Sequence, residues 1–140
     1  MHLRSYDPIP DGWLDPALGE RWAGIRQVRQ VVTTALEAAR NDGAIGASLQ
    51  AAPVVHVDAA RAELFAGEDA AALFITSDAQ ITTDAAPADA FRVEGIENAA
   101  VAFAKADGGK CARCWKIMPE VTIEDGICNR CDDVVNAAAE

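Results

Sequence analysis

The sequence has few aromatic residues and few histidines, and no long apolar run. Tryptophan, tyrosine and phenylalanine make up 6% of the 140 residues, and there are two histidines. No apolar stretch approaches the roughly 18 residues that a membrane-spanning helix needs. The start of the chain, "MHLRSYDPIPDGW", has neither the apolar segment nor the cleavage site of a signal peptide. We therefore expect no membrane partner and a cytoplasmic location, where thiols stay reduced.

Residue patterns for catalysis are also missing. His2 lies in the N-terminal arm and His56 stands alone in an alternating strand pattern, where a histidine is usually structural. The "GGK" at residues 108–110 lacks the spacing and the following Ser or Thr of a phosphate-binding loop. The acidic residues of 58–97 are scattered, as on a solvated face. The sequence thus predicts a binding or positioning module without an active site.

The charge is unevenly distributed along the chain. The net charge is −10, and residues 51–104 account for −7 with two arginines against nine acidic residues. Residues 105–118, by contrast, carry four basic residues and one acidic residue, a net charge of +3. The overall charge argues against broad nonspecific binding to nucleic acids, but it leaves room for a narrow basic contact.

Hydrophobic periodicity predicts an α+β fold that begins with one long helix at residues 16–41. Asp15 before Pro16 is a favourable helix start, and "NDG" at 41–43 is a favourable end. The apolar stripe of this helix should pack against the sheet or neighbouring helices and consists of Trp22, Ile25, Val28, Val32, Leu36 and Ala39.

The remaining chain reads as a small mixed or antiparallel sheet with a short helix, followed by a cysteine-rich ribbon. We predict strands at 53–58, 71–78, 91–95 and 99–106, a brief strand at 80–83, and a helix at 59–67. The stretch 120–126 resembles one arm of a hairpin. Three units follow from this division: an arm with the long helix (1–50), an α/β segment (51–106) and a cysteine-rich ribbon (107–140).

All four cysteines lie in two CxxC pairs, Cys111/Cys114 and Cys128/Cys131, thirteen residues apart. Two such turns can direct four sulfurs to one point, which suits one structural Zn²⁺. Iron can occupy the same ligands, whereas disulfides would need an oxidising compartment. Catalytic zinc is excluded because four cysteines leave no open coordination position.

Basic and aromatic residues stand among these cysteines, and two interpretations apply to them. The basic residues are Lys110, Arg113, Lys116 and Arg130, and Trp115 follows Cys114 directly. The bases either offset the formal charge of −2 on a zinc tetrathiolate or contact RNA phosphates. For Trp115 we favour a role as the core of the ribbon over stacking on a base.

Four stretches in a fixed order resemble a known family. They are "ERWAGIRQVRQVVTTALEAARNDGAIGASLQA", "LFITSD", "KCARCWK" and "ICNRC", and together they resemble the C-terminal end of bacterial isoleucyl-tRNA synthetases over residues 2–135. The HIGH and KMSKS signatures and an editing domain are absent. The resemblance therefore implies a C-terminal fragment that helps to hold isoleucine tRNA, while other parts of the synthetase attach isoleucine with ATP.

The resemblance also implies partners and site residues. The partners are isoleucine tRNA and the rest of the synthetase chain, with no DNA expected, and the zinc ligands are the four cysteines. The candidate RNA contacts are Lys110, Arg113, Trp115, Lys116 and Arg130 in the ribbon, and Arg26 and Arg29 on the long helix. The alternative is a free-standing zinc-ribbon adaptor for proteins, or another nucleic-acid-binding zinc module similar to the DNA-glycosylase zinc finger.

Overall fold

The computed structural model describes residues 7–137, so His2 and both extreme ends of the predicted units lie outside the described residues. The chain begins with a short 3₁₀ turn, η1 (Asp11–Trp13), and then enters helix α1 (Pro16–Asn41). The Asp15 carboxylate accepts a hydrogen bond from the Leu18 amide, and Gly43 takes a left-handed φ of 72° after the last turn. The predicted bounds, N-cap and left-handed end of the long helix are therefore confirmed.

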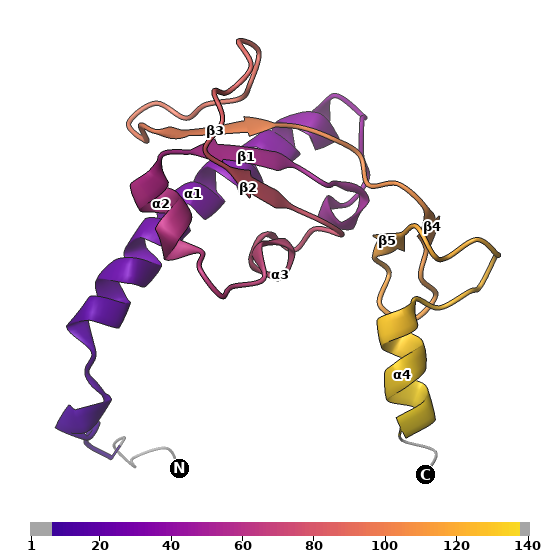
Figure 1. Ribbon diagram of the computed structural model, residues 1–140, viewed down its shortest axis with the longest axis horizontal. Coiled ribbons are helices and arrows are strands. Elements are labelled where there is room, and N and C mark those ends of the chain that lie inside the picture. The colour runs from indigo at the N-terminus through magenta and orange to yellow at the C-terminus, as the bar shows by residue number, and fades with distance from the viewer. Residues whose placement is uncertain (1–6, 138–140) are drawn as a thin grey trace, which may run out of the picture.

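Helix α1 lies along one face of a three-stranded sheet (Figure 1). Ile25, Val28 and Val32 are almost fully buried there, and Trp22 packs against them while partly exposed. The apolar stripe thus faces the core as its spacing predicts. Among residues 7–137, no helix is both long enough and apolar enough to span a bilayer.

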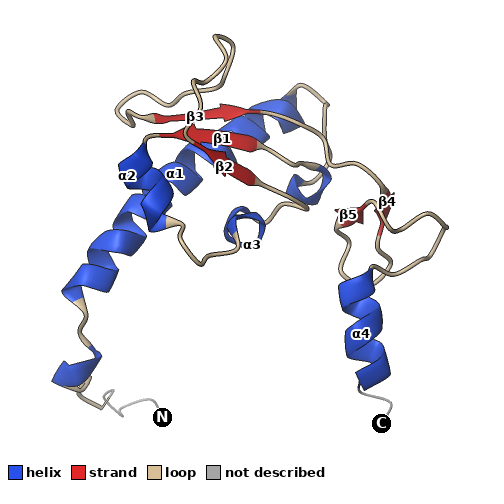
Figure 2. Cartoon of the chain, in the orientation of Figure 1, coloured by secondary structure: helices blue, strands red, loops and turns tan. Residues whose placement is uncertain are grey.

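The sheet is mixed, with strand order β2-β1-β3 (Figure 2). Strand β1 (Val54–Val57) pairs in parallel with β2 (Gln80–Thr82) and antiparallel with β3 (Ala99–Ala102). The crossover from β1 to β2 carries helices α2 (Ala59–Leu64) and α3 (Ala70–Phe74). A second 3₁₀ turn, η2 (Ser48–Gln50), connects α1 to β1.

Two of the predicted strands are wrong. The stretch 71–78 is mostly helix α3 and its C-terminal turn, because Asp69 caps the Ala72 amide and Ile75 ends the helix in a left-handed conformation with φ 58°. The stretch 91–95 contributes only an isolated bridge between Phe91 and Val101, since the chain turns at Gly95 with φ 81°. The predicted strands at 53–58, 80–83 and 99–106 exist in shorter form.

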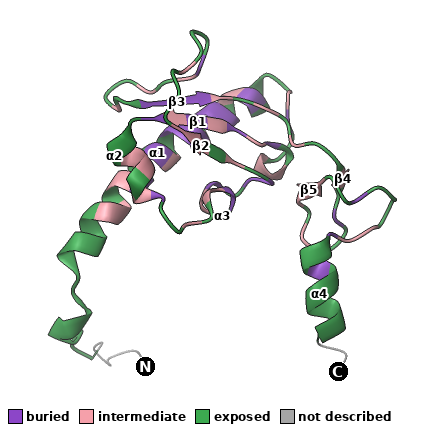
Figure 3. Ribbon diagram, in the orientation of Figure 1, coloured by how far each residue is buried: buried purple, intermediate pink, exposed green. Residues whose placement is uncertain are grey.

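The C-terminal part is a small ribbon followed by a helix. Strands β4 (Gly109–Lys110) and β5 (Ile117–Met118) pair antiparallel, and α4 (Asn129–Ala137) follows the second cysteine pair. The hairpin is closed by β5 and not by 120–126, which forms turns, so the prediction for that stretch is wrong. Buried residues concentrate between α1 and the sheet, whereas α4 is exposed apart from one turn at Cys131 (Figure 3).

Candidate metal centre and its basic surroundings

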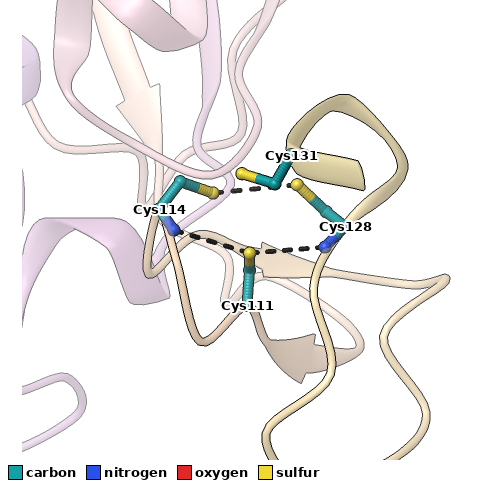
Figure 4. A group of neighbouring side chains, drawn as sticks. All are labelled: Cys111, Cys114, Cys128 and Cys131. Carbon is teal, nitrogen blue, oxygen red and sulfur yellow. Dashed lines mark hydrogen bonds between the residues drawn. The ribbon is translucent and has the colours of Figure 1, made fainter. Parts of the chain in front are cut away.

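The two CxxC turns bring the four cysteine sulfurs together. Cys111 and Cys114 lie between β4 and β5, while Cys128 and Cys131 flank the start of α4, and their Sγ atoms all lie within 4.8 Å of one another (Figure 4). The Sγ atoms of Cys114 and Cys128 are 3.8 Å apart. Tetrahedral coordination with Zn–S bonds near 2.3 Å places sulfurs about 3.8 Å apart. The geometry therefore fits one tetrahedrally bound metal ion.

Backbone amides point at one of these sulfurs. The amide of Cys114 lies 3.5 Å from Cys111 Sγ and the amide of Cys128 lies 3.3 Å from it (Figure 4). Burial raises the pKa of Cys111, but backbone hydrogen bonds from Cys114, Cys128 and Arg113 outweigh it, and the pKa falls to about 6. These N–H groups stabilise the thiolate, which is the form that binds metals.

The sulfurs of Cys114 and Cys128 lie in a less favourable setting for a negative charge. Burial raises the pKa of Cys114, and burial together with the neighbouring thiols raises the pKa of Cys128 to about 12. A metal cation at the centre would remove this penalty, because a coordinated thiol loses its proton. All four donors are sulfur, and Cys111, Cys128 and Cys131 are buried. The site therefore suits a structural metal ion whose four coordination positions are all filled by protein ligands.

The bases of the ribbon differ in accessibility. Lys110, Arg113 and Arg130 are exposed, and Lys116 is half-buried. The backbone carbonyl of Lys116 accepts a hydrogen bond from the Cys111 amide, which closes the first cysteine turn. Three of the four predicted bases are therefore open to a partner.

Trp115 does not form the core of the ribbon, so that expectation is wrong. Its side chain is 61% exposed, and its φ of 68° is left-handed. The Lys110 ammonium lies 5.5 Å from the centre of the indole ring, within cation–π range. The ring also lines a shallow cavity of about 570 Å³ together with Lys110, Val121, Ile123, Glu124 and Asp125, among others.

The two candidate arginines on α1 have different surroundings. Arg26 is exposed, whereas Arg29 is half-buried and its Nε donates to the Leu73 carbonyl at the end of α3, at 2.9 Å. Arg21, which the sequence analysis did not single out, donates to the carbonyls of Leu64 and Ala66. Both arginines thus cap short helices, and no spacing in the sequence signals contacts across more than 40 residues.

The chain is similar to curated proteins of one enzyme family. No protein-family model matches the chain. It is 47% identical over 135 residues to the isoleucine–tRNA ligase of Ruegeria pomeroyi, 41% identical over 140 residues to that of Gluconobacter oxydans, and 43% identical over 122 residues to that of Agrobacterium fabrum. These matches cover 94%, 98% and 86% of this chain but only 14%, 14% and 13% of the relatives. By sequence, the chain is similar to one segment of isoleucine–tRNA ligases, and it spans about one-seventh of the length of these relatives.

Proposed function

We propose that this chain is the C-terminal tRNA-positioning module of an isoleucine–tRNA ligase. In this proposal it acts in the cytoplasm with two partners, isoleucine tRNA and the rest of the ligase, which joins isoleucine to that tRNA with ATP. Residues 107–140 form the metal-binding unit, and residues 1–50 and 51–106 form the body that carries it.

The first part of the proposal is one structural zinc ion held by Cys111, Cys114, Cys128 and Cys131. A tetrahedral all-sulfur site without an open position is typical of structural zinc in a reducing compartment. Elemental analysis of purified protein tests this part, with zinc near one equivalent as the expected result. Iron in its place, or four thiols that titrate freely in native buffer, contradicts it.

The second part is RNA contact by the outer face of the ribbon, and the observation that carries it is the exposure of Trp115 beside Lys110. An indole that is 61% exposed contributes little to folding, yet it can stack on an unpaired base. Lys110 and Arg113 are exposed on the same short segment and can reach phosphates. Lys116, Arg130 and Arg26 are further candidates, and Arg29 is a weaker one because it already caps α3.

Reversing two exposed charges in the complete ligase tests this contact. Lys110→Glu with Arg113→Glu should weaken tRNA binding and lower the slope of log K against log[salt] by nearly one unit per lost phosphate contact. Arg40→Glu with Arg92→Glu is the matched control, because both side chains are exposed on the α/β unit of residues 7–106 and the change in net charge is the same. Equal tRNA affinity in both variants, with zinc and folding intact, would leave the bases as counter-charges to the metal site.

A further inference from the structure

The cysteine ribbon and the α/β unit have separate hydrophobic cores. The large core extends from Ile25 on α1 to Val101 on β3. The small one consists of Val121 with three buried cysteines, and Cys114, Met118 and Ile127 pack against it. The ribbon lies beside the α/β unit (Figure 1). Because the two units share no hydrophobic core, core packing does not fix the orientation of the ribbon on the α/β unit.

The covalent connection between the two units leaves that orientation open. The last backbone hydrogen bond before the ribbon joins the Ala106 amide to the Gln50 carbonyl. Asp107 and Gly108 follow, both exposed, and Gly108 has φ 113°, a conformation open mainly to glycine. An exposed two-residue link of this kind permits rotation about its backbone bonds.

One hydrogen bond ties the two units together. The Ile117 amide of the ribbon donates to Ser77 Oγ of the α/β unit, at 2.6 Å. Within the described residues 7–137, this is the one hydrogen bond between the two units, and no ion pair joins them. The Ser77 hydroxyl in turn donates to the Leu49 carbonyl, and Ser77 is only 6% exposed. Ser77 thus connects the turn after α1, the segment after α3, and β5 in the ribbon.

This contact lies one residue from the metal-binding turn. Ile117 follows Lys116, whose carbonyl accepts from the Cys111 amide. Ile117 also lines a small groove of about 210 Å³ with Ala44, Ile45 and Gln50 of the α/β unit. Ser77 is therefore hydrogen-bonded to the backbone directly after the segment that carries the first two cysteines and the bases beside them.

We propose that Ser77 is a positioning residue that latches the ribbon in one orientation on the α/β unit, and so presents the exposed bases of the ribbon to RNA. The statement about RNA rests on the function proposed above, whereas the latch itself does not. Without the hydroxyl, the ribbon keeps its fold and its metal but turns independently on the link at Asp107 and Gly108.

Nuclear magnetic resonance of the 140-residue chain, purified with its bound metal, tests the latch. In the native chain, residual dipolar couplings of both units should fit one alignment tensor. In Ser77→Ala the ribbon should need its own, weaker tensor, and hydrogen exchange at the Ile117 amide should speed up about tenfold, as for the loss of one hydrogen bond. Unchanged metal content and unchanged β1–β3 chemical shifts show that both units remain folded.

Two further variants sharpen the test. Thr76→Val removes the neighbouring buried hydroxyl, which bonds only to Ala71 within the α3 turn, and should leave a single tensor. Ser77→Thr keeps the hydroxyl and should also keep the common alignment. A single tensor in Ser77→Ala, or separate tensors in Thr76→Val as well, overturns the latch.

The RNA half is tested in the complete ligase. Ser77→Ala should weaken tRNA binding several-fold, with Thr76→Val close to the native affinity. Native affinity in Ser77→Ala overturns the positioning role if Lys110→Glu with Arg113→Glu does weaken binding. If neither change affects tRNA, the proposed RNA contact has failed, and the dipolar couplings still decide the latch.

Discussion

Loss of one metal ligand should unfold the ribbon and leave the α/β unit intact. Cys128 is the ligand to change, because it is buried and its sulfur lies 3.8 Å from that of Cys114. In Cys128→Ser the remaining three thiols no longer form a closed site. We expect the content of bound metal to fall and residues 109–131 to become disordered.

The magnitude follows from how little apolar surface the ribbon buries. Among ribbon residues 107–137, Val121 is the one fully buried aliphatic residue, and Met118 and Ile127 are only half-buried. Burial of a complete aliphatic side chain stabilises by about 1.5–3 kcal/mol, so these three contribute at most about 6 kcal/mol. Structural zinc contributes roughly 10–16 kcal/mol of apparent binding free energy. With a zinc ion bound as proposed, the ribbon should therefore depend on the metal for its fold, whereas the core beside α1 should not.

Nuclear magnetic resonance spectra of the backbone amides and circular dichroism together provide the assay. Signals of 109–131 should lose their dispersion in Cys128→Ser, while those of β1 and β3 stay in place. Helical ellipticity should fall by no more than the share of the nine residues of α4, because the 26-residue α1 persists. Thr122→Ser, an exposed change in the same ribbon, is the control. A dispersed ribbon in Cys128→Ser, or unfolding of the whole chain, would refute this reasoning.

Three further outcomes follow from individual side chains. Arg29→Ala should lower the free energy of unfolding by about 1.5–3 kcal/mol, because its charged hydrogen bond to the Leu73 carbonyl is lost, whereas exposed Arg26→Ala should stay within about 0.5 kcal/mol in the same denaturant titration. Ile75→Gly should raise the melting temperature, since a β-branched residue at φ 58° bears about 1–2 kcal/mol of left-handed strain; a lower melting temperature would show that its half-exposed side chain matters more. Trp115→Gly should preserve metal binding and stability but cost about 1–3 kcal/mol of tRNA binding in the complete ligase, and loss of folding would instead restore a core role for the indole.

The sequence predicts the elements of the fold correctly where a local rule decides the structure. Asp15 and Pro16 define the start of α1 by capping, and the apolar stripe defines its buried face. The two CxxC pairs predict the metal site because thiol spacing and turn geometry are local properties. The mixed sheet and the short helix α2 follow from alternating and turn-forming residues in the same way.

The misassigned strands show where local rules are ambiguous. "AALFITSD" is a short apolar run, and such a run fits a strand or a buried helical turn equally well. The cap at Asp69 and the left-handed turn at Ile75 decide for the helix, and the apolar spacing does not encode them. The contacts of Arg29 and Ser77 are even harder to predict from the sequence, because their partners lie 44 and 40 residues away along the chain.

The exposure of Trp115 follows from the chemistry of the metal site. Four sulfurs and Val121 already fill the centre of the ribbon, so an indole has no cavity to occupy. The first cysteine turn requires a reversal at the residue after Cys114, with the Trp115 amide donating to the Cys111 carbonyl. Glycine would adopt the left-handed φ of 68° there without strain. A bulky aromatic residue at such a position adds strain and little burial, which favours a role for the ring at the surface, beside Lys110.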